Sequence, residues 1–320
     1  MVPVRNARTI ELKVSLFLPL ENTAGRLLEE LEADVKKRSD GRLVLKLYPS
    51  GALGETKSQY DLARSGKADI VYVMHGTMPG RFPLTELATL PFVVPNPIAG
   101  TAALLELLPR YFAREHDGVR LLFLAANAPL AVHTQVPLRS VEDFKGLRIR
   151  VPGTVAGATL SALNAVPISV LPLDVPEALR VGAVDGAAMT FQGAAFSRLA
   201  GLVKYSTTLD ANTVTFGLVM NTESYRRLPA ELRKVVDDVL GYSAGRKLAQ
   251  ALGRDASAGK VYMRNGGVTI IDTAQRERAA LDIAVQPVVA RTIAKLEADG
   301  LPAREVYDAL KIEVARALSN

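Results

Sequence analysis

Two arginines, Arg148 and Arg150, are the residues whose type and spacing best suit binding chemistry in this sequence. They lie in residues 147–151, where aliphatic residues occupy the alternate positions. A strand repeats every two residues, so the aliphatic side chains share one face and both guanidinium groups share the other. Two cations on a stiff strand that ends at Pro152-Gly153 can hold an anion. The alternative is a strand with a solvated basic face, because exposed arginines are common.

Composition limits the classes of protein. The chain has 320 residues, enough for two domains, and 48% hydrophobic with 22% charged residues is typical of a soluble globular protein. No apolar run approaches the ~18 residues of a membrane-spanning helix. Cysteine is absent, which excludes disulfides, thiolate catalysis and cysteine metal sites. The net charge of +6 comes from 39 basic residues interleaved with 33 acidic ones, and tryptophan is absent, so we expect no nucleic-acid partner.

Strands alternate with helices along the first third of the chain. Residues 10–18, 43–48 and 70–74 have the aliphatic character of buried strands, and helices are expected between them. This order predicts a largely parallel sheet, in which ligands bind at the carboxyl ends of the strands. Those ends are Leu18-Pro19-Leu20 and Met74-His75-Gly76.

After Asn127 the chain builds a second α/β unit. Strands are expected near residues 130–134, 147–151, 186–190, 203–208, 213–221 and 268–271, and helices near residues 155–164, 174–181, 192–200, 274–298 and 302–317. Apolar positions recur at helical spacing between Pro229 and Met263. An unbroken helix of that length, roughly 50 Å, is long enough to cross two lobes. Glycines at 241, 245 and 253 would allow that helix to bend.

The two halves share a short internal similarity. Residues 63–69 and 179–185 agree at an arginine, a glycine and an aspartate. In each stretch a helix is expected to end at the glycine before the chain enters a strand. The agreement fits two lobes of similar construction, and it also fits chance or a common helix-to-strand turn.

Motifs of common enzymes are absent. The sequence has no phosphate-binding GxxxxGK[ST], no dinucleotide-binding GxGxxG and no GxSxG elbow. Its three histidines are far apart and have no metal-ligand spacing, although His75 lies at a strand end where ligands bind. We therefore expect no catalytic residues, no cofactor and no metal.

Several stretches resemble, in order, the motifs of one family. Residues 41–54 are similar to its G-(K/R)-hydrophobic…YPSGQLG signature, and residues 90–92 to its LPF. Residues 143–152 resemble its D-L-K-G-L-K-(I/L)-R-V-P, and residues 178–186 its A-L-Q-x-G-x-V-D-G. Weaker matches lie at residues 62–69, 220–221 and 228–229. From about residue 10 to about residue 245, the chain resembles the DctP-type substrate-binding proteins of TRAP (tripartite ATP-independent periplasmic) transporters.

The resemblance implies a two-lobed α/β periplasmic binding protein, type II-like, whose lobes close on an organic acid. Each lobe would have a mainly parallel sheet with flanking helices, and a long helix would span both. Lobe I would comprise residues 1–126 plus about 213–250, and lobe II residues 127–212 plus about 251–320. The implied partners are the small and the large TRAP integral membrane subunits, and we expect a monomer. The implied location is the periplasm with the signal peptide removed; residues 1–6 alone, which lack an apolar signal region, also fit a cytoplasmic protein.

The resemblance also assigns a role to each arginine. The arginine of the family's R-V-P binds the ligand carboxylate, and that position is Arg150 here. A guanidinium can form two parallel hydrogen bonds with a carboxylate, which lysine cannot do. Arg148 occupies a position where the family accepts lysine, so we expect it on the solvated face.

Departures from the family pattern suggest which acid is bound. Many members have a second arginine where this chain has Leu130, sialate binders have a glutamate at the position of Met74, and the family's aromatic position is Pro172. One cation with an apolar surrounding favours a monocarboxylate with an apolar or aromatic body, because a second carboxylate would lack a charge partner. The predicted ligand-binding residues are Arg150, Met74, His75, Leu130, Pro172, Met189, Phe191, Phe216, Thr215 and Pro19.

Other functions remain open at this point. The same family includes binders of C4-dicarboxylates and other polar organic acids. A binding protein of an ABC importer would share the two-lobe construction, and an α/β enzyme acting on a small acid belongs to a different class. The effector domain of a transcription regulator would need a DNA-binding module, whereas this chain starts with a strand.

Overall fold

The computed structural model describes residues 9–273 and 275–319. By its contacts the chain divides into two compact units. The first unit comprises the chain up to Val73, His116–Leu124 and Gly217–Leu248; the second comprises Met74–Glu115, Ala125–Phe216 and the chain from Ala249. No helix in the described part of the chain is both long and apolar enough to cross a membrane.

A five-stranded sheet in the order β2-β1-β3-β10-β4 forms the centre of the first unit. β1 runs parallel to both β2 and β3, as the alternating order of strands and helices predicts. The side chain of Asn22 caps α1 by accepting a hydrogen bond from Ala24 N, and α1 buries Leu27, Leu31 and Val35 along one face. The elements here are β1 (Ile10–Leu16), α1 (Thr23–Arg38), β2 (Leu43–Tyr48), α2 (Gln59–Arg64), β3 (Ile70–Met74), β4 (Val119–Ala126), β10 (Thr215–Asn221), α8 (Thr222–Arg226) and α9 (Ala230–Leu240). Three of these strands have one end in the second unit, which includes Met74 of β3, residues 125–126 of β4 and residues 215–216 of β10.

A six-stranded sheet in the order β11-β9-β5-β8-β6-β7 belongs to the second unit. β6 runs parallel to β7 and β8, and β11 runs parallel to β9, whereas β5 runs antiparallel to both β8 and β9. The sheet is therefore mixed, with three parallel and two antiparallel pairings. The edge strand β7 was not predicted, because its proline, Pro167, does not suggest a strand; an edge position tolerates it. The strands are β5 (Ala131–Thr134), β6 (Arg148–Val151), β7 (Val166–Ser169), β8 (Gly186–Met189), β9 (Tyr205–Thr208) and β11 (Thr269–Asp272). The helices are α3 (Pro83–Glu86), α4 (Pro97–Leu107), α5 (Thr154–Ala162), α6 (Val175–Arg180), α7 (Phe191–Phe196), α11 (Gln275–Ala298) and α12 (Ala303–Ser319).

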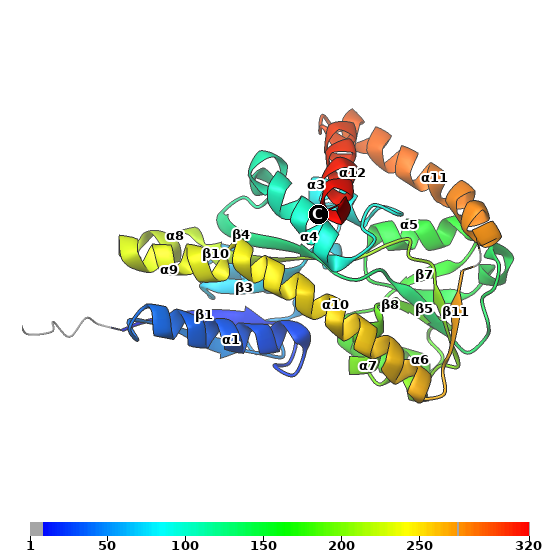
Figure 1. Cartoon of the computed structure of the whole chain (residues 1–320), viewed down its shortest axis with the longest axis horizontal. Coiled ribbons are helices and arrows are strands. Elements are labelled where there is room, and N and C mark those ends of the chain that lie inside the picture. The colour runs from blue at the N-terminus through cyan, green and yellow to red at the C-terminus, as the bar shows by residue number, and fades with distance from the viewer. Residues whose placement is uncertain (1–8, 274, 320) are drawn as a thin grey trace, which may run out of the picture. The chain divides into compact units, whose positions relative to one another are not determined.

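Residues 74–115 group with the second unit, whereas the sequence placed all of residues 1–126 in one lobe. The reason is the packing of the C-terminal helix. α12 buries Val306, Leu310 and Val314 and lies against α4 (Figure 1). Contacts to the end of the chain therefore decide the grouping of this segment, and local sequence does not reveal them. The predicted start of lobe I, residues 1–8, lies outside the described residues.

The long helix predicted after Pro229 is interrupted at Gly241. α9 ends at Leu240 and α10 (Tyr242–Asn265) follows, with Gly241 at ψ −139° between them. A Cβ atom at Gly241 would lie 2.3 Å from Asp237 O, so only glycine fits this close turn. α10 itself contributes residues 242–248 to the first unit and residues 249–265 to the second.

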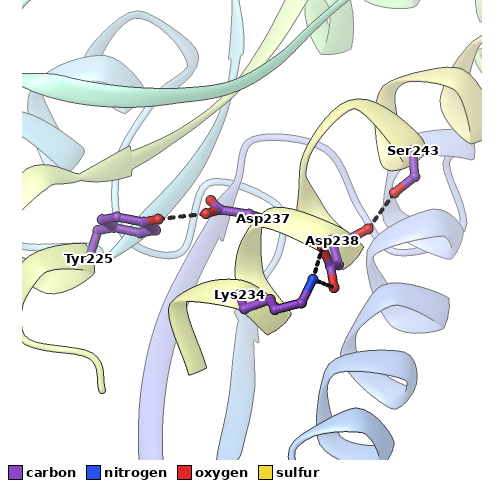
Figure 2. A network of polar contacts seen from close by, with 5 residues as sticks. All are labelled: Tyr225, Lys234, Asp237, Asp238 and Ser243. Atoms are coloured by element: carbon purple, nitrogen blue, oxygen red, sulfur yellow. Dashed lines mark hydrogen bonds and ion pairs between the residues drawn. The ribbon is translucent and has the colours of Figure 1, made fainter. Parts of the chain in front are cut away.

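Polar contacts hold the α9–α10 junction (Figure 2). Tyr225 Oη donates to Asp237 Oδ2 at 2.6 Å, and Ser243 Oγ donates to Asp238 O at 2.6 Å across the break. Arg120 of β4 completes the group, because it pairs with Asp237 Oδ1 at 2.8 Å and lies over the Tyr225 ring at 4.1 Å. The contacts join α8, α9 and β4 within the first unit.

The two similar stretches, residues 63–69 and 179–185, form the same kind of helix-to-strand turn. Gly66 and Gly182 have φ values of +72° and +69° and follow α2 and α6. Asp69 N donates to Lys13 O at 2.9 Å and its carboxylate accepts from Lys13 N at 2.7 Å. In the same way, Asp185 N donates to Arg148 O at 2.7 Å, and the Asp185 carboxylate accepts from Arg148 N at 2.8 Å. In both units this aspartate joins the start of one strand to its parallel neighbour.

We predict that Gly182→Ala lowers the free energy of unfolding by about 1 kcal/mol, since an L-residue is strained at positive φ. No atom lies within 4 Å of the added Cβ, so the effect would come from the backbone alone. The matched control is Gly253→Ala in α10, which also has open space and should raise stability by about 0.5–1 kcal/mol. Urea unfolding would measure both, and equal effects would contradict the prediction.

Candidate ligand-binding site

Arg150 is a cation almost completely removed from water. It lies in β6 and is 2% exposed. Its Nε donates to Val170 O at 2.9 Å and its Nη1 to Ala188 O at 3.0 Å. No carboxylate pairs with it among residues 9–273 and 275–319, and burial lowers the pKa of its guanidinium to about 10. The group remains charged at neutral pH, with N–H groups left for an anion.

Arg148, two residues earlier on the same strand face, has a different environment. Its Nε and Nη2 donate to the two carboxylate oxygens of Asp185 at 3.0 and 2.6 Å. Its side chain is 45% exposed. Asp185 therefore already satisfies this guanidinium, and of the two arginines only Arg150 is left without an acid.

His133 lies in the same cross-strand row as Arg150. Arg150 pairs with Ala187, Ala187 with His133 and His133 with Ser206, and paired residues on neighbouring strands point to one face. His133 Nε2 donates to Met189 O at 3.1 Å, because a carbonyl can only accept, so Nδ1 accepts from Ser206 Oγ at 2.7 Å. Burial lowers the pKa of His133 to about 4. The ring is neutral and adds no second cation to this face.

Met189 and Phe191 lie in a buried cluster beside this row. Met189 follows Ala187 by two residues on β8 and therefore shares the face of Arg150. Phe191 contacts His133 edge-on with 5.5 Å between ring centres. Both belong to a core cluster that also includes Val175, Leu199 and other apolar residues of the second unit. Core packing alone therefore accounts for their apolar character, and Met189 shares the strand face of Arg150.

His75 and Thr215 are a second predicted pair that the structure brings together. His75 Nδ1 lies 3.1 Å from Thr215 Oγ1, and the ring meets Phe82 edge-on at 4.9 Å. Both side chains are buried, at 0% and 1% exposure. His75 follows the end of β3 and Thr215 begins β10, so the sheet itself sets their spacing.

The remaining predicted residues are spread more widely. Met74, Leu130 and Phe216 are buried in the second unit, and Pro172 is half-buried there. Pro19 belongs to the first unit. Within the described residues no group of three or more His, Cys, Asp or Glu side chains is arranged to hold a metal ion.

The sequence did not predict a small hollow of about 280 Å³ in the second unit, a volume that includes its solvent-open part. Its walls are residues 152–156, residues 213–215, Gly76, Glu86 and Thr89. Residues 152–153 connect β6 to α5 and residues 154–156 begin α5, so the wall of the hollow starts two residues after Arg150. It therefore adjoins the strand that carries the buried cation.

Glu86 is the only ionisable side chain in the wall of this hollow. Its Oε1 atom is buried without a hydrogen-bond partner. Burial, together with the nearby carboxylate of Glu115, raises the pKa of Glu86 to about 7. Glu115 instead accepts hydrogen bonds from Leu84 N and from Thr85 N and Oγ1. No motif or spacing in the sequence distinguishes Glu86 from a surface glutamate.

Two α/β sheets with flanking helices and one long helix are the architecture of a two-lobed solute-binding protein. The family model for bacterial extracellular solute-binding proteins, family 7 (DctP), matches residues 15–296. The chain belongs to this family, whose homologues include TRAP solute-binding proteins.

Individual relatives agree with this assignment. A TRAP solute-binding protein of Rhodoferax ferrireducens in complex with copurified benzoate is 26% identical, with a TM-score of 0.93 over 97% of this chain and 99% of that one. A TRAP solute-binding protein of Bordetella bronchiseptica with bound (R)- and (S)-mandelate is 25% identical. Its TM-score is 0.89, and the match covers 96% of this chain and 99% of that one. The sialic acid-binding protein SiaP of Vibrio cholerae is 32% identical over 179 residues, and the match spans about half of each chain, 52% of this one and 51% of SiaP.

We predict that Glu86→Gln stabilises the protein more at pH 8 than at pH 5. The folded-state pKa of Glu86 is raised above its unfolded value, so the folded state binds more protons and wild-type stability falls as pH rises from about 4.5 to 7. Glutamine does not ionise, so the variant avoids this fall in the free energy of unfolding, which amounts to about 2–4 kcal/mol. Urea unfolding at both pH values would measure this stability difference, with Glu106→Gln, an exposed glutamate of α4, as the control. A pH-independent difference between wild type and Glu86→Gln would contradict the prediction.

Proposed function

We propose that this protein captures an organic monocarboxylate with an apolar or aromatic body and delivers it to the membrane subunits of a TRAP transporter. The observation that carries the proposal is Arg150, a buried guanidinium with no acid among the described residues. A buried unpaired charge is costly, so a protein that keeps one is expected to use it. A ligand carboxylate supplies the missing charge and accepts two N–H groups at once.

The surroundings of Arg150 support one carboxylate rather than two. His133 on the same face is neutral, and Arg148 is already paired with Asp185. Leu130, just before β5, offers no cation, and apolar Ala187 and Ile168 are the direct cross-strand neighbours of Arg150. The relatives with bound benzoate and mandelate hold aromatic monocarboxylates, which supports the same ligand class here.

We infer a periplasmic location, a monomeric state and binding without chemical change of the ligand. The family consists of extracellular solute-binding proteins, which supports the location and argues against an enzyme. The alternative within the family is a binder of C4-dicarboxylates or other polar acids. Turnover of any acid that binds would instead indicate an enzyme.

Replacing the proposed anchor should remove binding. We predict that Arg150→Ala and Arg150→Lys weaken benzoate binding at least tenfold, about 1.4 kcal/mol, since neither side chain can form two parallel bonds with a carboxylate. Isothermal titration calorimetry measures the affinity, and urea unfolding checks the fold of each variant. Arg148→Ala is the matched control from the same strand and should leave affinity within about threefold. If Arg150→Ala binds benzoate within about threefold of the wild-type affinity, or ~0.7 kcal/mol, the carboxylate is anchored by another residue.

A ligand panel tests the single-cation pocket. Benzoate and mandelate at millimolar concentration should raise the melting temperature, because binding to the folded state stabilises it by RT ln(1 + [L]/Kd). Succinate and malate should raise it much less, since their second carboxylate would be buried without a charge partner. Strong stabilisation by the dicarboxylates, with the aromatic acids silent, would overturn the proposed ligand class.

A further inference from the structure

We propose that His133 is a positioning residue for acid binding. Its hydrogen bond to Met189 O fixes the end of β8, and that strand end orients the guanidinium of Arg150 for a ligand carboxylate. The inference rests on the proposed function, because Arg150 is the proposed anchor. His133 acts through the backbone without touching the acid, and it lies outside the predicted set of ligand-binding residues.

The first support is that two side chains bond to consecutive carbonyl groups at one strand end. β8 ends at Met189, and the last pair that it forms with β6 is Ala187 with Arg150. Beyond that pair, Arg150 Nη1 donates to Ala188 O at 3.0 Å and His133 Nε2 donates to Met189 O at 3.1 Å. Only the two backbone torsions of Met189 separate these carbonyls, so a shift of one displaces the other.

The second support is the way in which His133 itself is fixed. Ser206 Oγ donates to His133 Nδ1 at 2.7 Å, which leaves the ring proton on Nε2, where Met189 O accepts it. Burial lowers the pKa of the ring to about 4, so this neutral tautomer is kept at neutral pH. Phe191 meets the ring edge-on with 5.5 Å between ring centres. Both ring nitrogens are therefore bonded and one ring edge is packed, which holds Met189 O in a defined place.

The third support is the need of Arg150 for a fixed orientation. Its Nε donates to Val170 O at 2.9 Å and its Nη1 to Ala188 O, so two backbone carbonyls set the plane of the guanidinium. The donors of Nη2 remain for a ligand. Two parallel bonds to a carboxylate require that plane to be correct, and a guanidinium already held in it loses less entropy on binding. A displaced Ala188 O would remove one of the two carbonyls.

The first measurement observes Arg150 in the ligand-free protein by NMR of its guanidinium nitrogens. A guanidinium with restricted rotation gives separate Nη1 and Nη2 signals, whereas a rotating one gives a single averaged signal. Loss of the signals in Arg150→Lys assigns them. We expect separate signals in the wild type and in His133→Gln, whose amide keeps a donor for Met189 O, and averaged signals in His133→Leu, which has no donor.

The second measurement is calorimetry with benzoate. His133→Leu should bind it about tenfold more weakly than the wild type, the scale on which residues behind metal ligands act. His133→Gln should bind within about twofold of the wild type, and Ser206→Ala, which removes one neutral hydrogen bond, about threefold more weakly. The matched control is His116→Leu, because His116 is another buried histidine but belongs to the first unit. It should leave the affinity unchanged, and urea unfolding checks the fold of every variant.

The two measurements separate the positioning role from the proposed function. Separate Arg150 signals in His133→Leu, or wild-type affinity in that variant, would overturn the positioning and leave the proposed acid binding standing. A His133→Gln variant as impaired as His133→Leu would also overturn it, since the hydrogen bond would not be the cause. If His133→Leu does not fold, unchanged Arg150 signals and unchanged affinity in Ser206→Ala overturn it instead. Arg150 signals that depend on His133 in a wild type that binds no benzoate support the positioning and overturn the proposed ligand class.

Discussion

The proposed binding site depends on one constraint, a buried cation that has no acidic partner among the described residues. Arg150 is held between two backbone carbonyls, Val170 O and Ala188 O, which orient the guanidinium without neutralising it. Desolvation of a charge costs several kcal/mol, and neutral acceptors offset only part of that cost. In the proposed function, a bound anion supplies the negative charge that the protein does not place beside Arg150.

In the sheet around Arg150, the other basic side chains on the same face are either paired with an acid or uncharged. The other arginine of β6 is satisfied by Asp185, which also joins β6 to the turn after α6. The histidine in the same row is kept neutral by burial and by its bonds to Ser206 and Met189. One strand thus presents one free cation, while its neighbours provide hydrogen bonds and apolar surface. The hollow after β6 brings in Glu86, whose charge can change near neutral pH.

The sequence predicts individual strands and the position of Arg150, but it does not predict how the strands pair or how the helices pack. Alternation in residues 147–151 predicts β6, and the family motif distinguishes Arg150 from Arg148, which alternation alone places on the same face. The antiparallel direction of β5, the edge strand β7 with Pro167 and the contact of α12 with α4 depend on partners far away in the chain. The break at Gly241 was foreseen only as a possible bend, since helical periodicity continues through it. Glu86 was missed because its burial comes from tertiary packing and not from any local pattern.

The central claim is that Arg150 selects a monocarboxylate by supplying the single charge partner of the site. Native mass spectrometry after equilibration with an equimolar mixture of benzoate, mandelate, succinate and malate tests it most directly. We expect one aromatic monocarboxylate bound per wild-type chain and none on Arg150→Ala. A dicarboxylate on the wild type, or the same adduct on the variant, would contradict it.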